Sequence, residues 1–230
     1  DNKIPLDEIT ILKDEVKERK EDNLVFKKDV IIKQFLSYIV GCMFGRYNPE
    51  KEGFILANQG ETIDDFKLDS KFKPDEDNII PITDRDYFSD DIVGNVKTFL
   101  KTYFGENNIT ENLDFIASGL KGSGSPEEKL RRYFLKDFFK DHKKIYKKKP
   151  IYWLFTSGKE QGFNALIYMH RYNKEVLAKI RTDYLLKLQD KILTRIGLTK
   201  EDSRDKDILK RQSMEIKQYD ELLNHEAIKY

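Results

Sequence analysis

The feature that most constrains this chain is an apolar run at residues 35–45, which contains no charged side chain. It lies inside a predicted helix, residues 29–46, that is apolar on nearly every side, as is typical of a helix buried in a protein core. A membrane-spanning helix needs about 20 apolar residues, so we interpret this run as a core helix instead. Gly41 and Gly45 are four residues apart and share one face. This spacing either allows another backbone to approach closely or has arisen by chance.

The remaining hydrophobic periodicity predicts more helices and one β-hairpin. Residues 48–85 are irregular, with prolines and glycines and one short strand at 54–57. Two short apolar runs, 151–155 and 163–170, flank a polar segment with glycines, which is typical of a β-hairpin. The predicted helices are residues 86–104, 109–120, 126–148 and 173–197 and a last helix after 198, of which the final two pair antiparallel. We therefore expect a mainly α protein with a small β-hairpin, of the α+β class, with a helical bundle-like C-terminal region.

The same reading divides the chain into three segments. Residues 1–28 are highly charged and are interpreted as a segment that enters from a preceding domain. Residues 29–125 form a helical domain with a long acidic loop, and residues 126–230 hold a basic helix, the β-hairpin and the C-terminal helix pair. The second and third segments either form separate domains or pack as one. Because the sequence begins with Asp1 rather than Met, we interpret it as a piece of a longer protein.

Charge is nearly balanced overall but is distributed unevenly along the chain. The formal net charge is +1. Residues 61–91 hold eleven acidic and four basic side chains, whereas residues 129–149 hold ten basic side chains and only Asp137 and Asp141 as acids. This asymmetry indicates a local electrostatic function that the net charge conceals.

The basic stretch carries the main functional prediction. On a helix over 126–148, six cations share one narrow stripe about 27 Å long, opposite the apolar residues Leu130, Phe134, Phe138 and Ile145. Such a row can neutralise phosphates of double-stranded DNA without reading its sequence. Alternatively, the stripe is a solvated face that pairs with the acidic 61–91 segment. The stripe consists of Lys129, Arg132, Lys136, Lys140, Lys143 and Lys147.

The predicted hairpin adds two weaker candidates. His170 and Arg171 follow its second strand and either touch phosphate or sugar or serve the structure alone. The aromatic side chains Tyr152, Trp153 and Phe155 either stack on a base or belong to the core, which is the commoner role for aromatics in short strands.

Other chemistries find little support in the residues. The three histidines, His142, His170 and His225, are scattered, and Cys42 is the single cysteine, so neither a zinc site nor a disulfide is predicted. A lone cysteine in an apolar run favours an inert thiol and a cytoplasmic protein. No glycine-rich phosphate loop is present. We assign no catalytic, cofactor-binding or metal-ligating residue.

Several runs, in order, resemble one known family over roughly residues 30–195. It is the C-terminal part of PglX-type adenine-specific DNA methyltransferases of BREX phage-defence systems, which are related to type IIG restriction-modification enzymes. The runs are 35–47 (FLSYIVGCMFGRY), 53–57 (GFILA), 74–82 (PDEDNIIPI), 133–142 (YFLKDFFKDH), 149–155 (KPIYWLF), 163–172 (FNALIYMHRY) and 181–185 (RTDYL).

The resemblance implies a parent enzyme that binds S-adenosylmethionine and methylates a flipped adenine. Its (N/D)PP(Y/F) motif has no counterpart here, because Asn48-Pro49-Glu50 lacks the second proline and the aromatic residue. We therefore expect S-adenosylmethionine to bind in a methyltransferase domain outside this sequence, and whether these residues form an enzyme stays open. The implied function is a non-catalytic C-terminal region that supports DNA binding or scaffolding.

The implied partners are double-stranded DNA, the protein's own methyltransferase and target-recognition regions, and other phage-defence proteins, with no membrane. The alternative is a protein-interaction module. In that case the apolar 29–46 helix and the C-terminal helix pair dock on the methyltransferase domain or on other defence proteins.

Overall fold

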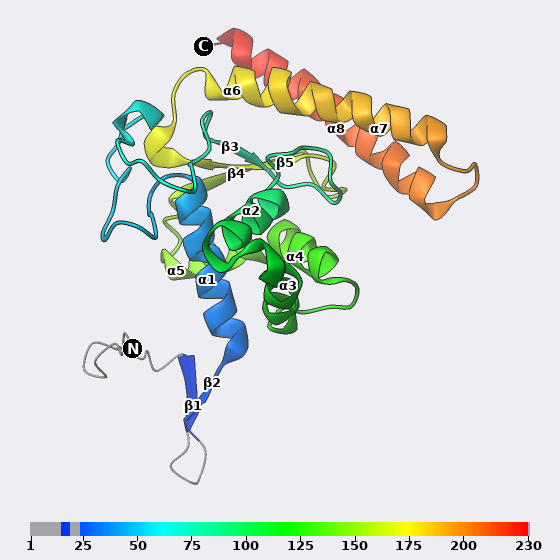
Figure 1. Ribbon diagram of the computed structural model, residues 1–230. Helices are drawn as coiled ribbons and strands as arrows, with labels where there is room; N and C mark the ends of the chain where they lie inside the picture. Colours follow the sequence, from blue (N-terminus) through cyan, green and yellow to red (C-terminus); the bar gives the residue numbers. More distant parts are fainter. Residues whose placement is uncertain (1–14, 19–23, 230) are drawn as a thin grey trace.

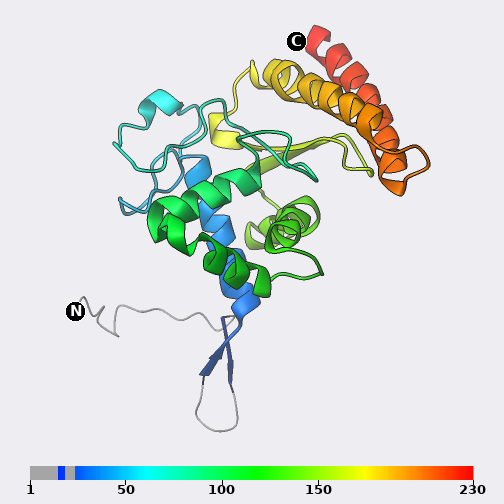
Figure 2. The same ribbon diagram turned by 45° about the vertical axis from the view of Figure 1, so that its right-hand side comes forward.

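The computed structural model describes residues 15–18 and 24–229. Most of the segment interpreted as entering from a preceding domain therefore lies outside the described residues. Its described part is an antiparallel pair of strands, β1 (Val16–Glu18) and β2 (Leu24–Phe26), with Val16 opposite Phe26. The pair leads directly into the first helix and projects from the body of the molecule (Figures 1 and 2).

A three-stranded antiparallel sheet forms the middle of the molecule. Its strands are β3 (Ile79–Pro81), β4 (Tyr152–Thr156) and β5 (Asn164–Tyr168), in the order β3-β5-β4. The predicted hairpin is confirmed as β4–β5, where Leu154 is opposite Leu166. The third strand was not predicted, and the strand expected at residues 54–57 is wrong, because that segment is irregular.

Helices cover both faces of this sheet, so the fold has three layers (Figure 1). Side chains of the central strand alternate between two hydrophobic cores. Leu166 and Tyr168 belong to the core under the first helical layer, whereas Ala165 and Ile167 belong to the core under the C-terminal helices. The first layer consists of α1 (Lys28–Met43), α2 (Ile92–Phe104), α3 (Ile109–Ser118), α4 (Pro126–Tyr133) and α5 (Phe139–Ile145).

Helix α1 is the centre of the first core, as its apolar sequence predicted. Leu36, Ile39 and Val40 are fully buried. Gly41 does leave room for a close approach, but by a side chain rather than a backbone: a Cβ there would lie 2.2 Å from Cδ2 of Tyr47. Gly45 follows the helix with a φ of +75°, a conformation that glycine adopts without strain.

The second layer is an antiparallel helix pair, which confirms the predicted pairing at the C-terminal end. Helix α6 (Val176–Lys179), the π-helical segment η7 (Ile180–Leu185) and α7 (Leu186–Leu198) run on as one continuous helix. Helix α8 (Arg204–Lys229) returns alongside α7. The remaining short elements are the 3₁₀ turns η3 (Ile63–Asp65), η4 (Glu106–Asn108) and η6 (Met169–Arg171) and the π-helical segment η5 (Phe134–Phe138).

Candidate nucleic-acid interface

The basic helix begins with strong local signals. Ser125 accepts a hydrogen bond from the backbone N–H of Glu128 at 3.3 Å, and the Glu128 carboxylate accepts one from the N–H of Ser125 at 2.7 Å. Pro126 occupies the first helical turn, where its missing N–H costs nothing. Helix α4, the π-helical segment η5 and α5 then follow without a break and end at Ile145.

The π-helical segment changes which side chains face the core. One extra residue in that turn keeps positions four apart in line, so Leu130, Phe134, Phe138 and His142 are all buried. Ile145, predicted on the same face, is instead 58% exposed, so that prediction was wrong. The wider turn also leaves the Leu135 carbonyl to accept a hydrogen bond from Nε2 of Gln161 in the β4–β5 turn, at 2.9 Å.

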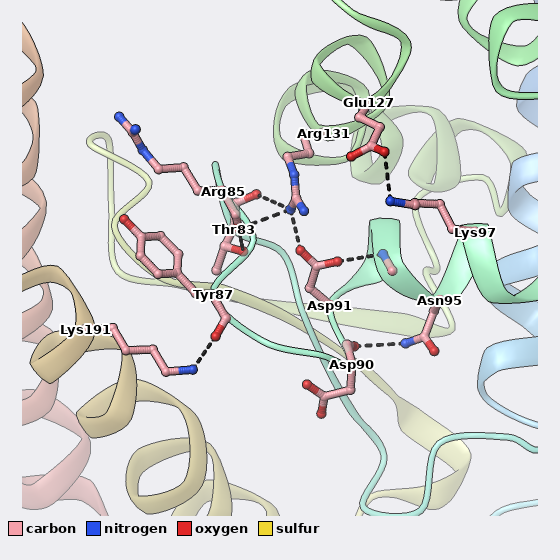
Figure 3. Close-up of polar contacts among 11 residues, drawn as sticks. Thr83, Arg85, Tyr87, Asp90, Asp91, Asn95, Lys97, Glu127, Arg131 and Lys191 are labelled. Carbon is pink, nitrogen blue, oxygen red and sulfur yellow. Dashed lines mark hydrogen bonds and ion pairs between the residues drawn. The ribbon is translucent and has the colours of Figure 1, made fainter. Parts of the chain in front are cut away.

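Arg131 fastens the start of this helix to the rest of the first layer (Figure 3). Its guanidinium forms an ion pair with Asp91, whose side chain is fully buried, and also donates to the carbonyls of Thr83 and Arg85 at 3.4 and 3.2 Å. The other Asp91 oxygen caps α2 by accepting from the N–H of Gly94 at 2.6 Å. Burial raises the pKa of Asp91, and the Arg131 partner opposes that rise.

His142 fastens the other end of the helix to the sheet. Its Nε2 accepts hydrogen bonds from the backbone N–H groups of Ile151 and Tyr152 at 3.1 and 3.3 Å, and its ring stacks on Tyr152 with 4.6 Å between centroids. An imidazole that accepts through Nε2 is neutral, with its proton on Nδ1. Burial accordingly lowers the pKa of His142 to about 4.

Only part of the predicted stripe forms an exposed row of cations on the helix. Lys136, Lys140 and Lys143 lie exposed on the helix, whereas Lys129 and Arg132 are half-buried. Arg132 folds back and donates to the carbonyl of Ser123 at 2.9 Å. The helix predicted to reach residue 148 ends at Ile145, so Lys147 lies in the turn that follows it, together with the exposed Lys148 and Lys149.

A small cavity of about 170 Å³ adds two cations from other elements to this surface. Lys33 on α1 and Lys121 after α3 line it beside Lys140 and Lys144. Asp141 also lines this cavity, and it pairs with Lys33 at 3.1 Å and with Lys144 at 3.9 Å. The cations therefore outnumber the acids on this surface, although several have a local partner.

The acidic segment 61–91 makes little direct contact with the basic stretch. Among the ion pairs of residues 15–18 and 24–229, the one that joins the two is the pair between Arg131 and Asp91. The pairs made by stripe residues in this part of the chain are local, as between Lys140 and Asp137 at 3.8 Å. Pairing with the acidic segment thus does not account for the exposed lysines of the helix.

Of the two hairpin candidates, Arg171 is buried and His170 is half-buried. Arg171 is 6% exposed and donates to the carbonyls of Phe44 and Glu76 at 3.3 and 3.0 Å. His170 stacks on Tyr168 with 5.1 Å between centroids. These contacts hold η6 against α1 and the loop before β3, and they do not bring either side chain to the lysines of the basic helix.

The hairpin aromatics are divided between core and surface. Tyr152 is buried against His142, and Phe155 packs under the C-terminal helices. Trp153, on the same face of β4 as Phe155, is 40% exposed and lies 5.6 Å from the Tyr172 ring.

The described residues hold no cluster of histidine, cysteine, aspartate or glutamate that suits a metal ion. Asn48 is buried, and its side chain is engaged by Ser70 and by the N–H of Glu50. Burial raises the pKa of the Cys42 thiol to about 12, in keeping with the inert thiol expected there. Within residues 15–18 and 24–229, each helix is too short or too polar to cross a bilayer.

Comparison with known proteins identifies the class. No protein-family model matches the chain. The chain is nevertheless homologous to a part of adenine-specific methyltransferases of the BREX type. The resemblance to PglX-type proteins is thereby confirmed, whereas a position at their C-terminal end stays a prediction.

Two relatives define the match. The chain is 37% identical over 219 residues to the adenine-specific methyltransferase BrxX of Escherichia coli O9:H4 (strain HS). The matched region covers 85% of the chain and 18% of BrxX. The chain is also 41% identical over 230 residues to the adenine-specific methyltransferase PglX of Lacticaseibacillus casei (strain Zhang). This matched region covers 94% of the chain and 19% of PglX. The chain thus spans less than a fifth of the length of these curated relatives.

Proposed function

We propose that this chain is a non-catalytic region of an adenine-specific DNA methyltransferase and that its basic helix contacts DNA phosphates. The observation that carries the proposal is the row of exposed lysines at residues 136–149, on η5, on α5 and after the end of α5. Lysine contacts with phosphate give affinity and position without sequence specificity. The recognised base sequence and the methyl transfer would then depend on other parts of the longer protein.

The way the helix is held supports this role. Its inner face is fixed by Arg131 at one end and His142 at the other. Because these anchors lie on the side away from the exposed lysines, the lysines sit on a rigid element and lose less conformational freedom when they meet a phosphate. Lys33 and Lys121 extend the cationic surface beyond the helix. His170 and Arg171 are left out of the proposed contact because of their structural contacts.

The methyl donor belongs to the same proposal. S-adenosylmethionine would bind in a methyltransferase domain outside this sequence, since no residue here matches its motifs. A cytoplasmic location fits host DNA as the substrate.

The docking alternative loses one of its two expected surfaces, the helix at residues 29–46. Helix α1 already buries its apolar side chains within this chain, so it offers little surface to another domain. The second expected surface, the C-terminal helix pair, does expose large apolar side chains: Leu193 and Leu198 on α7 and Met214 and Leu222 on α8. The docking alternative therefore rests on the C-terminal helix pair and no longer on α1.

The test is fluorescence anisotropy with a labelled duplex of about 20 base pairs at about 50 and 200 mM salt. We expect binding that weakens steeply with salt. A variant with Lys136, Lys140, Lys143 and Lys147 changed to alanine should bind much more weakly. If all four contact phosphates, the slope of log K against log salt should become shallower by about 3 to 4.

A matched control removes the same amount of charge from the opposite layer. It carries alanine at four exposed lysines of the C-terminal helices and the segment before them, Lys174, Lys187, Lys210 and Lys217. This variant should retain most of the affinity. Absence of binding at the lower salt concentration, or an equal loss in both variants, would contradict the proposed contact.

A further inference from the structure

A second cationic surface lies at the N-terminal end of α1, where the β1–β2 pair leaves the body of the molecule (Figures 1 and 2). A cavity of about 350 Å³, the strand-pair cavity, lies there between the two strands, the first turn of α1 and the end of α3. Its charged lining residues are four lysines and one acid: Lys17, Lys27, Lys28, Lys121 and Asp29.

The packing of α3 against α1 brings these lysines together. Gly119, just after α3, lies so close to α1 that a Cβ there would be 2.5 Å from Cδ1 of Ile32 and 3.3 Å from the carbonyl oxygen of Lys28. This close approach places Lys121 at the same cavity as Lys28. Lys17 on β1 adds a cation from the strand pair.

The positive charge of the strand-pair cavity is not neutralised within the chain. Among the ion pairs of residues 15–18 and 24–229, none involves any of its four lysines. Three of these lysines are exposed, and Lys27 is half-buried. Nζ of Lys28 lies 4.2 Å from the centroid of the Phe115 ring, a contact that positions the ammonium group without cancelling its charge. The cavity therefore suits an anion.

The strand-pair cavity adjoins the cavity beside Lys140. Leu120 and Lys121 line both cavities, and Lys121 is exposed at their boundary. On α1, Lys28 lines the first cavity and Lys33 the second, and five residues of helix separate them by about 7.5 Å along the axis. Together the two cavities are lined by seven lysines and three acids, so the surface suits a polyanion with repeated charges better than a single anion.

We propose that the strand-pair cavity is a second phosphate-binding site for the duplex that contacts the basic helix. This inference rests on the proposed function, because it concerns the same DNA. The DNA backbone would pass from the lysines of residues 136–149 across the cavity beside Lys140 to the β1–β2 pair. Phosphates follow one another at about 3.4 Å of axial rise on each strand, so lysines about 7.5 Å apart can meet different phosphates of one backbone.

The test is fluorescence anisotropy of the chain with the labelled duplex of about 20 base pairs, over the same range of salt. The variant Lys17→Gln/Lys27→Gln/Lys28→Gln removes three charges and keeps most of the length of each side chain. Lys121 is left unchanged because it lines both cavities. We expect affinity at about 50 mM salt to fall at least about fivefold, and the slope of log K against log salt to become shallower by about 2 to 3.

Two control variants separate phosphate contact from other effects. In the first, arginine replaces the same three lysines, Lys17, Lys27 and Lys28; it keeps the charge and should bind within about twofold of the original chain. The second, Lys174→Gln/Lys187→Gln/Lys217→Gln, removes three exposed charges from the C-terminal layer and should also bind within about twofold, with an unchanged salt slope. Circular dichroism of each variant checks that its fold is retained.

The Lys136/Lys140/Lys143/Lys147→Ala variant, measured alongside, distinguishes this inference from the proposed function. If that variant loses affinity and the glutamine variant of the strand-pair cavity does not, the second site is refuted and the contact of the basic helix stands. Loss in the glutamine variant alone would support the second site and contradict the contact of the basic helix. Absence of duplex binding by the original chain at about 50 mM salt would refute both.

Three further outcomes would overturn the second site. The first is an equal loss of affinity in the glutamine variants of the strand-pair cavity and of the C-terminal layer, which would indicate a general effect of charge. The second is an equal loss in the arginine variant, which would indicate a change of shape. The third is competition by a poly-glutamate peptide as strong as that by unlabelled duplex at the same concentration of charge, which would indicate a site for acidic protein segments.

Discussion

Replacing Arg131 by methionine tests whether the basic helix is anchored as the structure indicates. Methionine fills much of the same space but removes the guanidinium that pairs with Asp91. The Arg131 side chain is 11% exposed and that of Asp91 is fully buried, so water cannot replace the lost partner easily. Leaving a buried carboxylate unpaired typically costs 3–5 kcal/mol, and we expect about 3 kcal/mol here because Asp91 keeps its hydrogen bond from Gly94.

The assay is urea denaturation, in which unfolding is monitored by far-UV circular dichroism and by the fluorescence of Trp153, the single tryptophan. In a thermal melt of the same proteins, a loss of about 3 kcal/mol corresponds to a fall in Tm of roughly 6–12 °C for a chain of this size. The double variant Arg131→Met/Asp91→Asn retains an oxygen that can cap α2 but carries no buried charge. It should therefore recover about 2 kcal/mol relative to Arg131→Met alone.

The pH dependence provides a second check on the same reasoning. Burial already raises the pKa of Asp91 above its ordinary value, and loss of Arg131 raises it further. The carboxyl group then binds a proton more readily in the folded than in the unfolded chain, so the cost of Arg131→Met should grow as pH rises from about 5 to about 8. A cost below about 1 kcal/mol at pH 8, or one that is independent of pH, would refute the buried-pair account.

Two other buried groups give pH predictions of opposite sign. The pKa of His142 is lowered to about 4, so its contribution to stability is present above about pH 6.5 and is lost as pH falls toward 4. We expect the free energy of unfolding to drop by up to about 3 kcal/mol over that range. His142→Asn, which keeps a hydrogen-bond acceptor, should remove most of this drop. The pKa of Asp75 is raised to about 8 by burial and then by the neighbouring charge of Asp77, so its contribution is present below about 4 and is lost as pH rises through 8. The stability of Asp75→Asn, relative to that of the original chain, should therefore be higher at pH 9 than at pH 5. Urea midpoints of both proteins at both pH values measure this difference. An unchanged pH profile in either variant would show that the group does not titrate as its burial requires.

The sequence predicted the parts of this fold in which one hydrophobic period dominates. The continuous apolar run of α1 and the two apolar runs that form the β4–β5 hairpin each indicate a single structure, and the chain adopts it. Strand β3 was missed because it is three residues long and ends in Pro81, so it carries no readable alternation. Only its pairing with β5, about 85 residues later in the chain, makes it a strand.

The candidate site was less predictable, because its geometry depends on one π-helical turn. A constant step of 100° per residue places Ile145 on the inner face, whereas the extra residue in η5 brings His142 there instead. Arg171 similarly reads as a free cation in the sequence, although two backbone carbonyls hold it inside the fold.

The anchors and the lysines of the basic helix lie on different faces, and this separation decides what a loss of DNA binding would mean. Arg131 and His142 hold the inner face, and changing them would disturb the fold and the surface together. The outer lysines make only long, exposed pairs, such as Lys140 with Asp137 at 3.8 Å, which contribute little to stability. The Lys136/Lys140/Lys143/Lys147→Ala variant should therefore unfold at nearly the same urea concentration as the original chain. A loss of affinity in that variant can then be attributed to missing phosphate contacts and not to a damaged helix.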